Sequence, residues 1–479
     1  MNKLLSILAL SILINGSLLA QAKSGLGATF ELVNDTDISI PQKGSNSLTI
    51  GKANFWAHQN GNILKISKYV NSQRVLKVKF PFNAGEYKRI STNGQKFTTL
   101  GDHILEIIKN PNGKTSDYYV TAINTDLEVV KTLQMASVPK NTKGSKVKYF
   151  EKEGHLIFVQ YARISSSQQE LTITALNQDL EKIELDKYTI DVDENSSAFI
   201  SNIEIYENFL TATHQIFNEK TGNSSACSFK QYSLDGDHTT VLELGLPKDL
   251  STIYTTLQGD QLYLTGFTHD QIAHGTAGKV FHAKYSIENQ KLINYDEQVL
   301  GKEFIENLYN EEDLNKAKNG RNYDHLNYKI LESYLLDDAT TLTVAEHYLT
   351  YTQNVASTGV ERRYIRKGIV LIKTNKEGKI IWTKHLDRHM HSTEDGNGAI
   401  YQRLKDGQLH LIYQFDYYII ASLVDIKNEE VETSVVFDDK ESKHVLPHYD
   451  EFIELEKNKI AISCRGFVSA NALIIDFDN

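Results

Sequence analysis

One hairpin pattern recurs along this chain at intervals of about 50 residues. A polar turn is followed by a run of alternating apolar residues and then by a second run that contains a bulky aromatic residue. Turns rich in Asp, Asn and Gly that precede β-branched and aromatic runs are typical of β-hairpins. The turns stand at Gly101-Asp102, Glu153-Gly154, Glu207-Asn208, Gly259-Asp260, Asp337-Asp338, Asp406-Gly407 and Lys457-Asn458.

Further strands flank these hairpins and raise the count to about four in each unit. Residues 253–257 precede one turn, and residues 118–123 and 128–133 follow another. A period of about 40–50 residues with four strands per unit is typical of a β-propeller. A ring of sheets covers the faces of each sheet and leaves only short edges exposed. We therefore predict an all-β propeller of about seven four-stranded blades.

The predicted division of the chain follows from this count. Seven units are found from residue 97 onward, so the ring is expected to span 97–479. The last unit has only three strands, and strands within 23–96 are expected to close or join the ring. Eight blades remain open if residues 48–80 form a unit of their own. Residues 302–318 carry apolar residues at helical spacing, which predicts a helical insertion at about 302–320.

The first 22 residues predict a cleaved signal peptide. Lys3 precedes the apolar run 4–19, and Ala20-Gln21-Ala22 offers the small residues that signal peptidase requires. A membrane anchor needs about 20 apolar residues, more than this run has. We expect a soluble, exported protein that begins at Lys23, in the periplasm or outside the cell.

Net charge and cysteine content narrow the possible partners. The formal charge is −10 and becomes −11 when Lys3 leaves with the signal peptide. Nucleic acid binding needs clustered Lys and Arg, so we expect no nucleic acid partner. The two cysteines, Cys227 and Cys464, fall in non-adjacent repeats, and we expect buried free thiols.

The densest polar cluster of the sequence lies at 385–397. His389 and His391 are two residues apart, so on a strand they share a face, and Glu394 and Asp395 follow. Such a group is able to bind a ligand or a metal, but its spacing is not that of an established metal site. We keep these four residues as ligand-binding candidates and predict no metal and no cofactor.

Tyrosines are concentrated in the last repeats. The chain has 25 tyrosines, and most are expected to pack between blades with their hydroxyls at the rim. Tyr401 and Tyr417 are the candidates for an aromatic platform that binds a glycan or a peptide.

No catalytic motif stands out in the sequence. G-x-S-x-G, H-E-x-x-H and C-x-x-C are absent, and the Gly-rich segment 274–278 lacks the spacing of a phosphate-binding loop. Asp191, Asp193 and Asn195 imitate the start of a calcium loop, but Ser196 and Asn202 occupy the positions that require Gly and Glu.

Residues 368–386 resemble one blade of the propeller superfamily that includes quinoprotein-like proteins. Gly378, Lys379 and Trp382 match the G-K-x-x-W turn of that repeat. The resemblance implies that this turn closes an outer hairpin and that Trp382 docks on the next blade. It covers about 20 residues, does not recur, and implies no quinone cofactor.

Two classes of function follow from these observations. The favoured one is a secreted binding or scaffold propeller that recognises a protein, a peptide or a glycan. The alternative is a hydrolase or lyase with its site in the central channel, where His389 and His391 are the first candidates.

Overall fold

The computed structural model describes most of the chain. The described residues are 29–34, 45–51, 53–60, 63–70, 73–81, 96–140, 142, 144–152, 154–218, 224–234, 239–246, 250–269, 277–299, 328–336, 340–355, 359–392, 400–415, 418–438, 445–456, 459–466 and 470–476. Every regular element among them is a strand. None of these residues belongs to a helix long and apolar enough to cross a membrane. The predicted signal peptide and the predicted helix at 302–320 lie outside the described residues.

The strands form groups of four, and most groups are separate antiparallel meanders. The first three groups are β2 (Ser45–Ile50), β3 (Ala53–Asn60), β4 (Ile63–Val70) and β5 (Gln73–Pro81); β6 (Lys96–Leu100), β7 (His103–Asn112), β8 (Thr115–Ile123) and β9 (Val129–Pro139); β10 (Lys146–Lys152), β11 (His155–Arg163), β12 (Gln168–Leu176) and β13 (Lys182–Asp191).

Two further groups are joined into one eight-stranded sheet. A single residue pair, Ser224 with Leu250, links its two halves. The halves are β14 (Ser196–Tyr206), β15 (Phe209–Asn218), β16 (Ser224–Ser233) and β17 (Thr239–Glu243); β18 (Leu250–Gln258), β19 (Gln261–His269), β20 (Ala277–Ser286) and β21 (Lys291–Val299).

The last groups complete the series, and the final one combines both ends of the chain. Its fourth strand is β1 (Thr29–Asn34), which pairs antiparallel with β32. The groups are β22 (Tyr328–Leu335), β23 (Thr341–Val355), β24 (Gly359–Thr374) and β25 (Ile380–Ser392); β26 (Tyr401–Lys405), β27 (Gln408–Phe415), β28 (Tyr418–Asp425) and β29 (Glu430–Asp438); β30 (Val445–Glu456), β31 (Lys459–Gly466), β32 (Ala470–Asp476) and β1.

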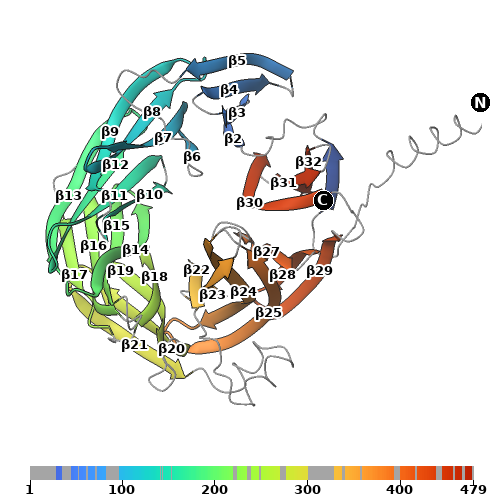
Figure 1. The fold of residues 1–479 in the computed structure, drawn as a ribbon. Coiled ribbons are helices and arrows are strands. Elements are labelled where there is room, and N and C mark those ends of the chain that lie inside the picture. Colours follow the sequence, from blue (N-terminus) through green and yellow to red (C-terminus); the bar gives the residue numbers. More distant parts are fainter. Residues whose placement is uncertain are drawn as a thin grey trace, which may run out of the picture.

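The groups follow one another around a common axis (Figure 1). The first strand of each group lies toward the centre and the fourth lies at the rim. The prediction of an all-β ring of four-stranded sheets is therefore confirmed. We call β2, β6, β10, β14, β18, β22, β26 and β30 the inner strands.

The hydrophobic core is divided among the spaces between neighbouring groups. Six clusters of buried side chains lie in sequence between the groups from β2–β5 to β26–β29. Trp382 on β25 is one example, since it packs in a cluster with Leu409 and Leu411 of β27. This docking on the next group is what the resemblance of residues 368–386 implies. Because apolar side chains fill the spaces between sheets, the axis is left to the inner strands and their polar residues.

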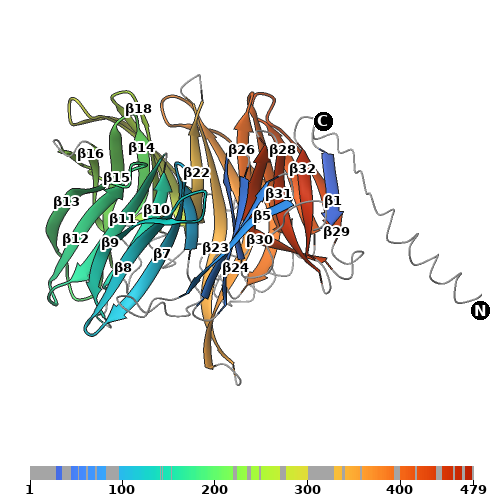
Figure 2. The same cartoon turned by 90° about the horizontal axis from the view of Figure 1, so that it is seen from above.

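The connections alternate between the two ends of the ring. In an antiparallel meander the turn from the second to the third strand and the connection from the fourth strand to the next group lie at the same end. We call this end the crossover face, and the other end the opposite face. The β23–β24 hairpin turns at the crossover face and extends beyond the other strands (Figure 2), because these two strands have 15 and 16 residues.

Cys227 is a free thiol buried in the cluster between β14–β17 and β18–β21. Burial raises the pKa of this thiol to about 12, so it is protonated at neutral pH and a poor nucleophile. The side chain of Cys464 lies outside the described part of the chain.

Candidate functional site

Four successive inner strands each contribute one polar side chain to a continuous chain of contacts. Lys152 on β10 donates to both carboxylate oxygens of Glu204 on β14, at 2.8 and 2.7 Å. The hydroxyl of Tyr254 on β18 lies 3.4 Å from Oε1 of Glu204. It also forms a short hydrogen bond with Oε1 of Glu332 on β22. We call these four residues the axial chain.

The middle of the axial chain favours uncharged groups. Burial raises the pKa of Glu332, and the nearby Glu204 carboxylate raises it further. The hydrogen bond from Tyr254 and the charge of Lys152 act in the opposite direction. Burial, followed by the two carboxylates, raises the pKa of Tyr254 well above that of a free phenol. Desolvation disfavours the charged form of an acid, and this is the main cause at both residues.

Backbone contacts between inner strands hold the axial chain in place. The Thr256 hydroxyl of β18 donates to the Ser333 carbonyl of β22 at 3.1 Å. The Leu257 amide of β18 donates to the hydroxyl oxygen of Tyr206 on β14 at 2.9 Å. Tyr254 and Glu332 lie next to these contacts, so their positions are set by strands on a rigid wall and not by loops.

Lysines occupy the ends of inner strands nearer the crossover face. Lys146 and Lys148 lie early on β10 and Lys329 lies early on β22, and all three are exposed. Desolvation by the surrounding protein lowers the pKa of Lys148, and the charges of Lys146 and Lys329 lower it further. Lysines of two non-adjacent inner strands therefore lie close enough for their charges to act on each other.

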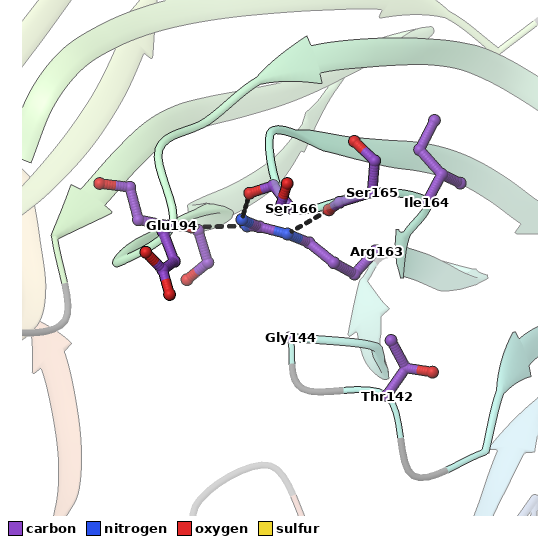
Figure 3. A pocket seen from close by; sticks show the side chains of 9 residues that line it. Thr142, Gly144, Arg163, Ile164, Ser165, Ser166 and Glu194 are labelled. Carbon is purple, nitrogen blue, oxygen red and sulfur yellow. Dashed lines mark hydrogen bonds between the residues drawn. The ribbon is translucent and has the colours of Figure 1, made fainter.

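A recess of about 340 Å³ opens at the crossover face between the β10–β13 and β14–β17 groups. Three connections form it: the β9–β10 connection, the β11–β12 turn and the β13–β14 connection. Figure 3 shows the side chains that line it, which are mostly hydroxyls together with one exposed carboxylate, Glu194. The lining residues are Thr142, Gly144, Arg163, Ile164, Ser165, Ser166, Glu194, Ser196 and Ser197.

Arg163 organises the wall of this recess. Its guanidinium donates to the Ser165 carbonyl at 2.8 Å, the Ser196 carbonyl at 2.8 Å and the Asp193 carbonyl at 3.0 Å. It also donates to the carbonyl of Ser166. Figure 3 shows the guanidinium directed at the backbone of both loops. Because the planar guanidinium presents five donors, one side chain fixes the β11–β12 turn against the β13–β14 connection.

A second set of contacts fixes the floor and rim of the recess. Gln169 is fully buried; its amide nitrogen donates to the Gly144 carbonyl at 3.3 Å, and its amide oxygen accepts from the Ala198 amide at 2.8 Å. At the rim, the Ser196 hydroxyl and the amides of Asn195 and Ser196 lower the pKa of the exposed Asp193 carboxyl. The recess is thus a preformed site with fixed walls, lined by both polar and apolar surface.

The structure places only part of the predicted ligand-binding cluster. His389 lies half-buried on β25 and His391 on the same strand, opposite Ile365 of β24. The side chain of His391 and all of Glu394, Asp395 and Tyr417 lie outside the described residues, so the cluster stays a prediction. β25 is the fourth strand of its group and lies at the rim (Figure 1).

Tyr401 is the one aromatic candidate whose side chain is described. It begins the inner strand β26 and is half-buried. It lies near Tyr334 of β22. The pKa of the Tyr334 hydroxyl is raised mainly by burial, and the charges of Glu332 and Tyr401 add to the effect. Tyr401 is therefore an inner-strand residue, close to one end of the axial chain.

Sequence reasoning missed the axial chain because its members are separated by about 50 to 80 residues, with one in each repeat. A signal was present nevertheless. Each member is a polar residue a few positions before the turn of its repeat, on the strand that precedes the turn. Aligning the repeats on these turns would have brought Lys152, Glu204, Tyr254 and Glu332 into corresponding segments.

Comparison with known proteins gives fold likeness and no family. No family model and no curated protein matches the chain. Similar solved structures include the Dos1 propeller (8% identity, TM-score 0.45, 92% of this chain and 94% of that chain) and Sqt1 of Saccharomyces cerevisiae (8%, 0.43, 92% and 99%). The polysaccharide lyase Uly1 is another (8%, 0.39, 91% and 90%). The likeness is too distant to assign a function, and the resemblance to quinoprotein-like repeats stays a prediction.

Proposed function

We propose that this protein is a secreted binding propeller that recognises a protein, a peptide or a glycan at its crossover face. The observation that carries the proposal is the recess at Arg163. It is concave, its walls are fixed by hydrogen bonds, and it presents several hydroxyls, one exposed carboxylate and the exposed Ile164. Preformed concave sites with a few fixed polar groups are the usual form of binding sites.

The position of the recess supports the same function. It lies at the end of the ring where the inner strands begin, and the lysines at the start of β10 and β22 lie at that end too. β25 ends and β26 begins at this face as well. A ligand at the crossover face would therefore meet several groups at once.

We further propose how the chain is divided. We take the eight groups of four strands as eight blades, the last of them closed by β1 pairing with β32. Residues 1–22 are taken as a signal peptide, 23–96 as strands that close or join the ring, and 97–479 as the remainder of the propeller. Export to the periplasm or the cell exterior follows from the signal peptide.

The test is a binding screen with a matched pair of variants. The mature protein, starting at Lys23, is applied to glycan and peptide arrays, and hits are measured by titration calorimetry. Glu194→Gln should weaken the hits several-fold, because it removes the carboxylate of the recess. Glu288→Gln alters an exposed carboxylate in the β20–β21 turn of the opposite face and should leave binding unchanged. Equal effects of the two variants would place the ligand elsewhere.

A hydrolase or lyase is the second candidate, and the axial chain is the observation that favours it. Two carboxyl groups and a phenol in contact on inner strands are the groups used for acid–base chemistry, and the raised pKa of Glu332 suits a general acid. The test is turnover of a panel of polysaccharides and glycosides. For any substrate found, Glu332→Gln should lower kcat at least 100-fold, whereas Glu194→Gln should act mainly on KM.

A further inference from the structure

The axial chain contains fewer hydrogens than its contacts require if both carboxyl groups are charged. The Tyr254 hydroxyl has one hydrogen, and its oxygen is within hydrogen-bond reach of both Glu204 and Glu332. When the hydrogen points to one carboxylate, the lone pairs of the phenol oxygen face the other. Two negative oxygens around one phenol repel unless one of them carries a proton.

The surrounding groups decide which carboxyl carries that proton. Lys152 donates to both oxygens of Glu204, with the side chains 32% and 21% exposed, so Glu204 has a cation beside it. Glu332 has the neutral Tyr254 hydroxyl as a hydrogen-bond partner, and the amide of Ser333 also donates to it. The titratable groups that act on Glu332 or on its partner Tyr254 come from four inner strands: Lys152, Glu204, Tyr206, Tyr254 and Tyr334.

We propose that Glu332 carries a proton at neutral pH and shares it through Tyr254 with Glu204, so that a proton-linked tie joins three successive inner strands. Glu332 donates to the Tyr254 oxygen, and Tyr254 donates to Glu204, which also accepts from Lys152. The hydroxyl hydrogens of Glu332 and Tyr254 then each have an acceptor, and the four side chains carry no net charge. Loss of the proton leaves one unbalanced negative charge and sets Glu332 against Glu204 across the phenol.

The proton-linked tie makes the stability of the inner strands depend on pH, and the sign of this dependence can be derived. A carboxyl that binds its proton more tightly in the folded than in the unfolded chain stabilises the fold at low pH, and this stability is lost as pH rises through the folded pKa. The raised pKa of Glu332 supports this direction. Above that pH, β14, β18 and β22 are held together less firmly around the axis. The proton on Glu332 is independent of which ligand the ring binds.

The experiment measures the proton directly. Infrared difference spectra of the full-length mature protein, recorded between about pH 5 and pH 9, should show the C=O band of a protonated carboxyl at neutral pH that disappears at higher pH. The band should be absent in Glu332→Gln and present in the control Glu288→Gln. Absence of the band from the unmodified protein at about pH 6, or its survival in Glu332→Gln, would overturn the proposal.

Thermal unfolding provides the second readout. Glu332→Gln mimics the protonated state, so its Tm should exceed that of the unmodified protein at high pH, and the difference should shrink toward low pH. Tyr254→Phe removes the hydroxyl that links the two carboxyl groups and keeps the aromatic ring of the side chain. It should shift the infrared band and weaken the pH dependence of Tm. A Tm difference that is the same at every pH would show that Glu332 is charged throughout, and the proposal would fail.

Discussion

Arg388 and Glu346 form an ion pair between two buried side chains, on the face of the β22–β25 group that packs against β26–β29. Arg388 is completely inaccessible to solvent and the Glu346 side chain is 5% exposed. Nε of Arg366 lies 3.5 Å from the same carboxylate oxygen. The three residues come from β23, β24 and β25. They lie beside a β-bulge between Arg366 and Gly368, where two residues of β25 are opposite one residue of β24.

We expect removal of the carboxylate from this buried cluster to lower the free energy of unfolding substantially. Glu346→Ala leaves two buried guanidinium groups without that carboxylate, and breaking a buried ion pair in this way costs about 3–5 kcal/mol. The free energy of unfolding is to be measured by urea titration. The exposed Glu288→Ala serves as control, with a change within about 0.5 kcal/mol. A loss at Glu346 as small as at the control would show that the arginines find other partners.

His214 predicts a loss of stability in mild acid. It lies buried between β13 and β16, with Tyr188 on Nδ1 and Tyr232 on Nε2 at 3.1 Å. Burial lowers its pKa to about 3, and the charge of Lys230 adds to the effect. The unfolded chain therefore binds a proton that the folded chain does not, and stability falls as pH drops below about 6.5.

The size of this effect follows from the same pKa difference. One such histidine contributes a loss of about 2 kcal/mol between pH 7 and pH 5. Urea titrations at the two pH values should show that His214→Gln has a smaller loss by about this amount, whatever its stability at pH 7. An identical pH dependence in the variant would mean that His214 takes up its proton as readily in the folded protein as in the unfolded chain. The sign is opposite to that expected for Glu332, so the two contributions are separable.

The fold was predictable because each repeat contains a turn that can be recognised from a few neighbouring residues. All seven turns read from the sequence fall at chain positions between the first and second strands of a group, from Gly101-Asp102 between β6 and β7 to Lys457-Asn458 between β30 and β31. Gly154 and Gly259 take positive φ values of 73° and 55°, which glycine adopts without strain. The group that the count of seven omitted turns at Gly51, within the residues 48–80 that the sequence left open as an eighth unit.

The sites were less predictable because they are assembled across groups. Arg163 looks like an ordinary strand-end residue, and only the fold brings the carbonyls of Asp193 and Ser196 to it. Glu204 and Glu332 are more than a hundred residues apart and meet through Tyr254 because inner strands of successive groups converge on the axis. By contrast, the cluster at 385–397 is dense in sequence, but its described part lies on a rim strand.

We expect any side chain larger than that of glycine at position 266 to be destabilising, although nothing in the local sequence indicates this. A Cβ at this position would lie 2.4 Å from the ring of Phe281 and 2.7 Å from the backbone oxygen of Thr252. Gly266→Ala should cost about 1–3 kcal/mol, as other overpacked core substitutions do. Gly245→Ala is the matched control, because nothing lies within 4 Å of its Cβ. Equal unfolding free energies of the two variants would show that β19 moves freely away from β20.

We expect the substitution of Arg163 to reduce both the stability of the fold and the affinity for the ligand. Arg163→Lys keeps the charge, but a single ammonium with three donors cannot reach the four carbonyls that the guanidinium bonds. Hydrogen bonds contribute about 0.5–1.5 kcal/mol each, so we expect a loss of about 2 kcal/mol in the free energy of unfolding.

The same substitution tests whether the recess is the binding site. Without the guanidinium, the β11–β12 turn and the β13–β14 connection lose their common anchor, and Glu194 and the serines lose their fixed positions around the cavity. For any array hit that depends on Glu194, Arg163→Lys should raise Kd at least several-fold. Arg74→Lys, at an exposed position of the rim strand β5, should change neither quantity. If Arg163→Lys lowers stability and leaves Kd unchanged, the guanidinium holds the loops together but the ligand is bound elsewhere.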